Sequence, residues 1–173
     1  MNKLFFATAL VCLFALAAFA QKSPDFSGKW NLDLTKSDLG QQAAMIKSQT
    51  LTITQSGTSF KVSTQTERNA PPADAAGGGG GNRGGGGFGG GGEQSYTLDG
   101  KEVSTDMQGP NGTMTIKNTA SQTGNKVVII SVRPGPNGDF KSTSTYELSG
   151  DGKTLTVTRE STRGTSKSVY TKG

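Results

Sequence analysis

The segment TLTITQSGTSFKVS, residues 50–63, decides the fold. Apolar and hydroxyl side chains alternate on both sides of Ser56-Gly57, and this period of two is typical of a β-strand with one buried face. Two such runs joined by a short turn that contains glycine predict an antiparallel hairpin. We expect Leu51, Ile53, Phe60 and Val62 to point into a core.

The same alternation continues to the end of the chain. Gly124-Asn125, Pro134–Gly138, Gly150-Asp151-Gly152 and Gly164 interrupt it at the points where turns are expected. Together with a first run near the front, the pattern predicts ten strands, at residues 29–34, 50–54, 60–63, 96–98, 101–107, 113–120, 126–132, 140–148, 153–160 and 165–171.

Two local features qualify this pattern. Asp99-Gly100 tolerates the positive φ of a type I′ turn, so residues 96–98 and 101–107 are expected to form a tight hairpin. Residues 35–47 lack the alternation, and a short helix is expected there, with Ser37 as its cap and with Leu39, Ala43, Ala44 and Ile46 as its apolar residues.

Short sequential connections favour an all-β, antiparallel up-and-down meander of about eight to ten strands. Closing the meander into a barrel removes both exposed edge strands, so a closed barrel is the favoured architecture. A two-sheet sandwich is compatible with the same alternation, because periodicity does not distinguish the two.

Residues 1–20 resemble a secretory signal peptide, with Lys3 before an apolar run and Ala18-Phe19-Ala20 before Gln21. The run is too short for a membrane span of about 20 residues, so no permanent anchor is expected. We predict export to the periplasm or the exterior and one mature domain, residues 21–173, without the thiol of Cys12. The net charge of +5 includes Lys3, which leaves with the signal peptide. The remaining basic residues are scattered along the sequence instead of clustered, so no nucleic-acid partner is expected.

Residues 70–92 form a Pro/Gly-rich insertion in which 13 of the 16 residues from Gly77 to Gly92 are glycine. Ordering a residue's backbone costs about 1–2 kcal/mol, and few side chains are present to offset that cost. A flexible loop inside a single domain is therefore expected.

The composition argues against catalysis. The sequence has no His, and its one Cys lies in the predicted signal, so the usual base, thiol nucleophile and transition-metal ligands are missing. Asp99, Glu102 and Asp106 lie near a turn and suit a solvated surface. We expect no enzyme, no catalytic residue, no metal site and no cofactor.

The apolar faces of the predicted strands supply the candidate lumen residues. These are Phe60, Val62, Tyr96, Met107, Met114, Ile116, Phe140, Tyr146 and Tyr170, together with Arg159. Arg159 follows Leu155 and Val157 on the same face, where it either sits at a barrel rim or faces a ligand carboxylate. Gln55 follows Leu51 and Ile53 in the same way.

The start of the mature chain, Gly28-Lys29-Trp30 followed by Asn31-Leu32-Asp33, resembles the Gly-x-Trp opening of lipocalin-like and other calycin barrels, including those exported by bacteria. The resemblance implies that Gly28 and Trp30 plug the closed end of a barrel. It also implies a basic packing partner for Trp30 near the last strand, either Arg163 or Lys167.

The end of the chain, Val169-Tyr170-Thr171-Lys172, resembles the final strand of fatty-acid-binding proteins, which reads Arg-x-Tyr-x-Lys. Ser168 replaces the carboxylate-binding Arg of that motif, and residues 35–47 lie where those proteins carry a helical lid. The opening is also similar to that of avidins, but a single Trp does not suit a biotin site. The resemblance implies a barrel that binds a small apolar or amphipathic molecule; the alternative is a structural or protein-interaction module of the cell envelope with a filled core.

Overall fold

A computed structural model describes residues 23–69, 92–109, 112–135 and 138–173. The predicted signal peptide, residues 1–20, and nearly all of the predicted insertion, residues 70–91, lie outside the described residues. Each of the ten predicted strands is present in the described part. The strands are β1 (Gly28–Leu32), β2 (Ile46–Ser56), β3 (Ser59–Arg68), β4 (Gly92–Thr97), β5 (Asp99–Gly109), β6 (Gly112–Thr123), β7 (Lys126–Arg133), β8 (Phe140–Leu148), β9 (Thr154–Ser161) and β10 (Gly164–Lys172).

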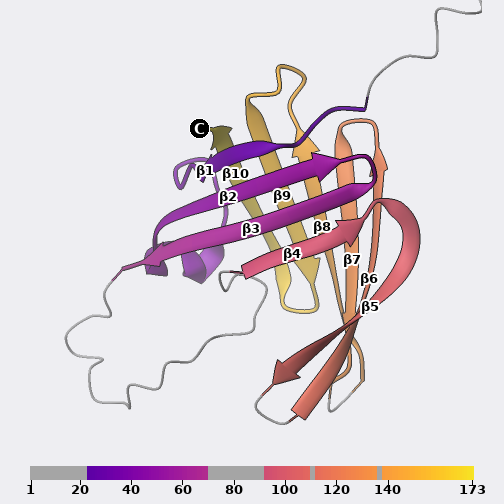
Figure 1. Cartoon of the computed structure of the whole chain (residues 1–173). Coiled ribbons are helices and arrows are strands. Elements are labelled where there is room, and N and C mark those ends of the chain that lie inside the picture. Colours follow the sequence, from indigo (N-terminus) through magenta and orange to yellow (C-terminus); the bar gives the residue numbers. More distant parts are fainter. Residues whose placement is uncertain (1–22, 70–91, 110–111, 136–137) are drawn as a thin grey trace, which may run out of the picture.

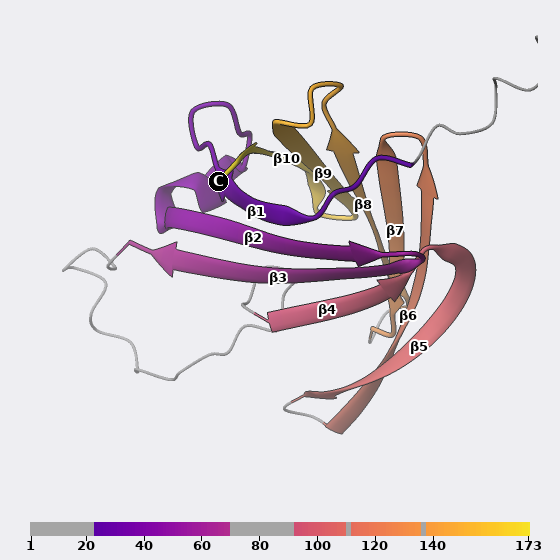
Figure 2. The same ribbon diagram turned by 45° about the horizontal axis from the view of Figure 1, so that its top comes forward.

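The strands form one antiparallel sheet in the order β4-β3-β2-β1-β10-β9-β8-β7-β6-β5. In Figure 1, β1–β4 run across the molecule and β7–β9 run steeply beside them, and the turned view of Figure 2 shows the same sheet wrapping around its interior. The first and last strands pair, with Trp30 opposite Lys172. The all-β meander prediction is confirmed, as one nearly closed barrel instead of a two-sheet sandwich.

The predicted hairpin between residues 96–98 and 101–107 is wrong. Gly100 has a φ of +74°, and the Lys101 backbone N–H donates to Asp99 Oδ1 at 3.0 Å, so the chain does turn there. However, β4 pairs with β3, and β5 pairs with β6. β4 and β5 are therefore the first and last strands in the sheet order, and they do not pair with each other.

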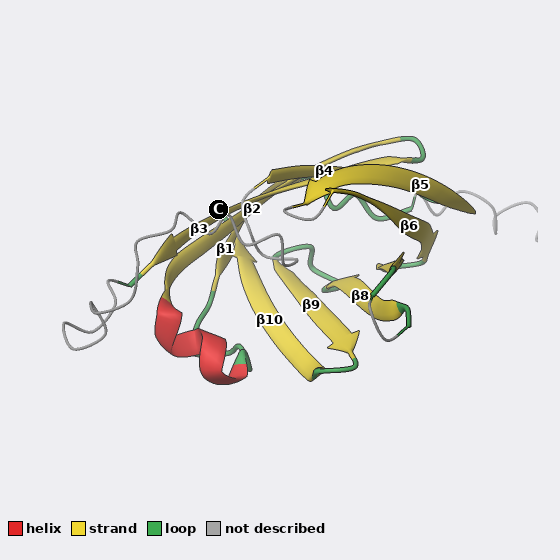
Figure 3. Ribbon diagram, turned by 90° about the horizontal axis from the view of Figure 1, so that it is seen from below, coloured by secondary structure: helices red, strands yellow, loops and turns green. Residues whose placement is uncertain are grey.

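The segment between β1 and β2 contains a six-residue 3-10 helix, η1 (Gly40–Met45), which Figure 3 shows at one end of the barrel. The expected cap is wrong, because no side chain caps η1 and the Ser37 hydroxyl donates to the Asp33 carbonyl at 2.7 Å. Ser37 also accepts the Val169 N–H at 2.9 Å. Its role is therefore to attach this segment to β10.

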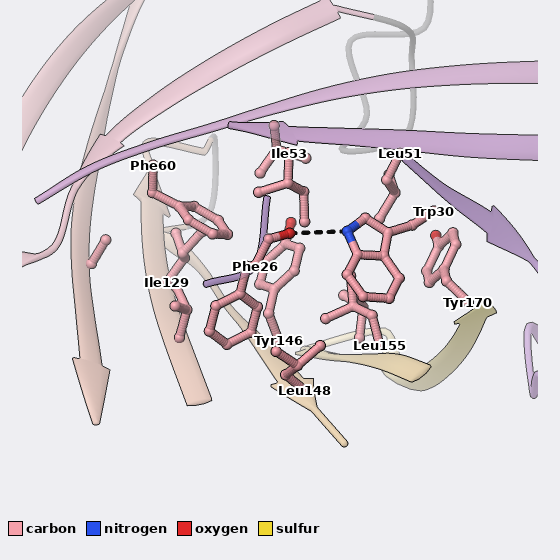
Figure 4. Close-up of a cluster of buried hydrophobic side chains, with 14 residues drawn as sticks. Phe26, Trp30, Leu51, Ile53, Phe60, Ile129, Tyr146, Leu148, Leu155 and Tyr170 are labelled. Atoms are coloured by element: carbon pink, nitrogen blue, oxygen red, sulfur yellow. Dashed lines mark hydrogen bonds between the residues drawn. The ribbon is translucent and has the colours of Figure 1, made fainter. Parts of the chain in front are cut away.

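A cluster of buried apolar side chains fills one half of the barrel, and Figure 4 shows its centre. Phe26, Trp30 and Phe60 are fully buried. Phe60 packs edge-to-face on Phe26 and on Tyr146, with ring centroids 6.0 and 5.6 Å apart. Such aromatic pairs stabilise a core beyond the area that they bury. We call this half the closed end.

Trp30 anchors the closed end. Its indole N–H donates to the Phe26 carbonyl at 3.0 Å, and Lys172 Nζ lies 5.3 Å from the ring centroid. The expected basic partner is therefore corrected to Lys172, because Arg163 lies in the turn between β9 and β10, at the far end of β10. Gly28 has a φ of +138°, and a Cβ there would approach Lys172 Cε to 3.2 Å, so glycine suits this position.

Candidate ligand cavity

The other half of the barrel contains a cavity of about 430 Å³. It lies beyond the apolar cluster, at the end formed by η1, the end of β3 and the β9–β10 turn, and we call this the open end. The residues lining it are Leu39, Gln42, Met45, Ile46, Gln49, Leu51, Thr64, Thr66, Arg68, Arg133, Phe140, Lys141, Ser142, Tyr146, Val157, Arg159, Ser161, Thr162, Arg163, Ser166, Ser168 and Tyr170.

Strand alternation explains why the interior changes character along its length. On β9, Leu155 and Val157 are buried in the core, and Arg159 is the next residue on the same face. On β10, Tyr170 is buried, and the preceding residues on its face are Ser168 and Ser166. Each strand therefore presents apolar side chains to the closed end and polar ones to the open end.

Gln49 joins two walls of the cavity. Its side-chain NH₂ donates to Thr66 Oγ1 at 2.8 Å, and its carbonyl oxygen accepts the Tyr170 hydroxyl at 2.7 Å. Because the Gln49 side chain both donates and accepts, the Tyr170 ring is held against the cavity wall.

Two half-buried arginines have fixed neighbours inside the cavity. Arg159 Nε donates to the buried Ser144 hydroxyl at 3.5 Å. The Arg133 guanidinium lies 5.2 Å from the centroid of the Phe140 ring. These contacts orient both side chains before any ligand is present, which reduces the entropy lost on binding.

The tyrosines that line the cavity remain neutral. Burial raises the pKa of Tyr146, and it raises the pKa of Tyr170 to about 12. The positive charge of Arg159 opposes both shifts without reversing either. The hydroxyls therefore stay protonated and serve as hydrogen-bond groups and not as bases.

The fold resembles solved small barrels, although their sequences are distant. No family model matches the chain, and the search of curated proteins gave no significant match. Human cRBP IV is similar with a TM-score of 0.53 and 16% identity over 87% of this chain and 99% of that chain. The REP1-NXSQ fatty acid transporter is similar with a TM-score of 0.51 and 18% identity over 86% of this chain and 96% of that chain. Secretory abundant heat soluble protein 4 from Ramazzottius varieornatus has a TM-score of 0.52 and 16% identity over 89% of this chain and 99% of that chain.

The chain has a calycin-type barrel fold. The resemblance predicted from Gly28-Lys29-Trp30 and from the final strand is confirmed at the level of the fold. In this calycin-type barrel the final-strand Tyr170 lines the cavity, and Ser168 lies beside it where the family's Arg was expected.

Four of the predicted lumen residues line the cavity of this calycin-type barrel: Phe140, Tyr146, Arg159 and Tyr170. The structure places five of the other six elsewhere. Phe60, Val62 and Ile116 are buried, Tyr96 lines a second cavity of about 280 Å³ beside β4–β6, and Met114 is 36% exposed. Met107 is paired with Met114, and its side chain lies outside the described part.

Sequence reasoning missed Arg68, Arg133 and Gln49. The signal was present, because Arg68 and Arg133 continue the inward rows of β3 and β7, just as Arg159 continues that of β9. An inward polar residue at the end of a strand is equally typical of a solvated rim, so alternation alone does not identify a cavity.

The described residues hold neither a cluster of metal ligands nor a membrane-spanning helix. No group of three or more His, Cys, Asp or Glu side chains is placed there to hold a metal ion. In the same ranges, no helix has the length and apolar character needed to cross a membrane.

Proposed function

We propose that the protein is a non-catalytic carrier that binds a small amphipathic molecule in the cavity at the open end. The observation that carries this proposal is an interior space of about 430 Å³ with Leu51 and Val157 at its inner end and arginines nearer the mouth. Ligand cavities in proteins measure roughly 300–1,000 Å³ and combine apolar walls with a few oriented polar groups. One of the similar barrels is named as a fatty acid transporter, which supports a ligand with an apolar part.

Export is part of the same proposal. The apolar run and the small residues at 18–20 support a signal peptide that takes the protein to the periplasm or the exterior. There the carrier would act on a small molecule without a permanent membrane anchor of its own, and without nucleic acid as a partner.

The filled closed end favours a second candidate, which is an interaction module of the cell envelope. Phe26, Trp30 and Phe60 are fully buried and belong to one apolar cluster at the closed end. If the remaining cavity holds only water, the outer surface of the barrel becomes the functional part.

Calorimetric titration with 1-decanol tests the carrier function. We expect one molecule to bind per chain, and Ser166→Trp to weaken binding at least tenfold because Ser166 lines the cavity. Thr165→Trp is the matched control, since Thr165 is exposed on the opposite face of β10. Circular dichroism would confirm that both variants fold.

Native mass spectrometry of the mature protein, purified without detergent, adds an independent readout. A small molecule that co-purifies and leaves on unfolding would support the carrier. A bare mass together with no decanol binding, or equal binding by both Trp variants, would contradict it and favour the interaction module.

A further inference from the structure

The arginines of this chain are concentrated in one place. The sequence contains five, at positions 68, 83, 133, 159 and 163, and four of them line the cavity at the open end. Position 83 lies outside the described residues. Lys141 adds a fifth cation to the lining, and no Asp or Glu is among the described residues that line the cavity. The cavity therefore has a strongly one-sided charge.

The cationic side chains that line the cavity come from different strands of the barrel. Arg68, Arg133 and Arg159 each take the inward position after buried or hydroxyl residues, on β3, β7 and β9 respectively. Arg133 and Arg159 are half-buried, whereas Arg68 and Arg163 are exposed nearer the mouth. A ligand group in the cavity thus meets cations on more than one side.

Six carboxylates of the described residues form ion pairs, and each pairs with a lysine. The ion pairs between described residues join lysines to Asp or Glu on the outer surface, as in Lys61–Glu93 and Lys126–Glu147. Arg133 and Arg159 line the cavity together with hydroxyl side chains such as those of Ser142, Ser166 and Ser168. Because Arg133 and Arg159 are partly withdrawn from bulk water, an anion that binds among the lining cations interacts with them more strongly than it would in water.

We propose that the head group of the ligand carries at least two negative charges, as a phosphate monoester does, and that Arg133 and Arg159 hold it. This inference rests on the proposed function of the cavity as a ligand site. Guanidinium groups match phosphate oxygens in pairs of hydrogen bonds, and the hydroxyls of Ser166 and Ser168 supply further donors. A single carboxylate would neutralise only one of the cations.

A series of ten-carbon probes distinguishes the contribution of the head group to binding from that of the apolar tail. Decyl phosphate, decanoate and 1-decanol are titrated at pH 8 below their aggregation limits, and inorganic pyrophosphate serves as a probe with no tail. We expect decyl phosphate to bind at least tenfold more tightly than decanoate, and pyrophosphate to compete with it.

The pH dependence supplies a second signature. The second ionisation of a phosphate monoester has a pKa near 6. The chain has no His, and burial raises the pKa of Tyr146 and of Tyr170, so both hydroxyls stay neutral between pH 5.5 and 8. Lowering the pH to 5.5 should therefore weaken decyl phosphate at least threefold and leave decanoate within twofold.

Charge variants locate the site. Arg133→Gln and Arg159→Gln should each weaken decyl phosphate at least tenfold, and each should weaken decyl phosphate more than it weakens 1-decanol, whereas Arg159→Lys should retain part of the affinity. Lys167→Gln is the control, because it removes one charge from an exposed position on the outer face of β10. Thermal melts would show that each variant is folded.

The possible outcomes separate the two claims. If 1-decanol and decanoate bind as tightly as decyl phosphate, or if Lys167→Gln weakens decyl phosphate as much as Arg159→Gln, the dianion inference is overturned and the carrier function stands. If pyrophosphate binds and no ten-carbon compound improves on it, the anion site stands and the amphipathic carrier fails. If no probe binds, both are overturned.

Discussion

Trp30 shows how one residue connects the two ends of the chain to the core. It pairs with Leu51 of β2 on one side and with Lys172 of β10 on the other, and its side chain is fully buried. Its ring fills space between the N-terminal segment and the last strand. No smaller side chain replaces both the volume and the N–H donor.

Trp30→Ala should lower the free energy of unfolding by about 3–5 kcal/mol, because it opens a cavity and removes the donor to the Phe26 carbonyl. Denaturant unfolding followed by circular dichroism measures this change. Trp30→Phe keeps much of the volume and should cost less. A near-neutral Trp30→Ala variant would contradict the structural role.

Asp33 should make stability depend on pH. The hydroxyl of Thr35, followed by Lys36, lowers the pKa of Asp33 to about 2. A carboxyl whose folded pKa is lowered stabilises the protein above its unfolded pKa of about 4, and this contribution is lost between pH 4 and pH 2.

The melting temperatures of the wild type and Asp33→Asn should therefore differ at pH 6, with the wild type higher, and converge as the pH falls to 2. Differential scanning fluorimetry over that range measures both. A constant difference between the two proteins down to pH 2 would show that the charge of Asp33 does not contribute.

At the scale of elements, the segment before β1 is attached across the closed end by side-chain amides. Gln55 on β2 accepts the Phe26 backbone N–H at 3.0 Å and donates to Gln122 of β6 at 2.7 Å. Gln122 in turn donates to the Pro24 carbonyl at 2.9 Å. Gln55 is thus an inward polar residue with a structural role, whereas Arg159 is one that faces a cavity.

Gln55→Ala should destabilise the protein by about 1–3 kcal/mol, since it leaves the Phe26 N–H and the Gln122 amide without their partner. Amide hydrogen exchange should also become faster at Phe26 and Ser27. The control is Gln65→Ala on β3, where the side chain is exposed. Equal effects of the two substitutions would mean that the amide chain contributes nothing.

At the scale of the whole molecule, the barrel is one sheet whose unpaired ends are β4 and β5. The β3–β4 pair extends from Ser59–Thr97 to Thr64–Gly92. The glycine-rich insertion is therefore attached to the outermost strand on that side of the sheet. This arrangement limits how strongly the length of the insertion affects the rest of the barrel.

Deletion of residues 77–90 should change the free energy of unfolding by about 1 kcal/mol or less, in the stabilising direction, because the cost of closing a loop grows only with the logarithm of its length. Denaturant unfolding of the deletion variant measures the change. A loss of several kcal/mol would mean that the insertion packs on the barrel, contrary to the sequence prediction.

The alternation of Thr with Leu, Ile and Val by itself determined the ten strands, the antiparallel pairing of most neighbours along the chain and the buried face of most strands. These features depend on contacts between residues near in sequence and on which face is buried. Only the tertiary structure decided the separation of β4 from β5, the partner of Trp30, and the collection of Arg68, Arg133 and Arg159 around one space. Strands distant in the chain meet at those points, and the register of the closed sheet sets which side chains share an end of the barrel.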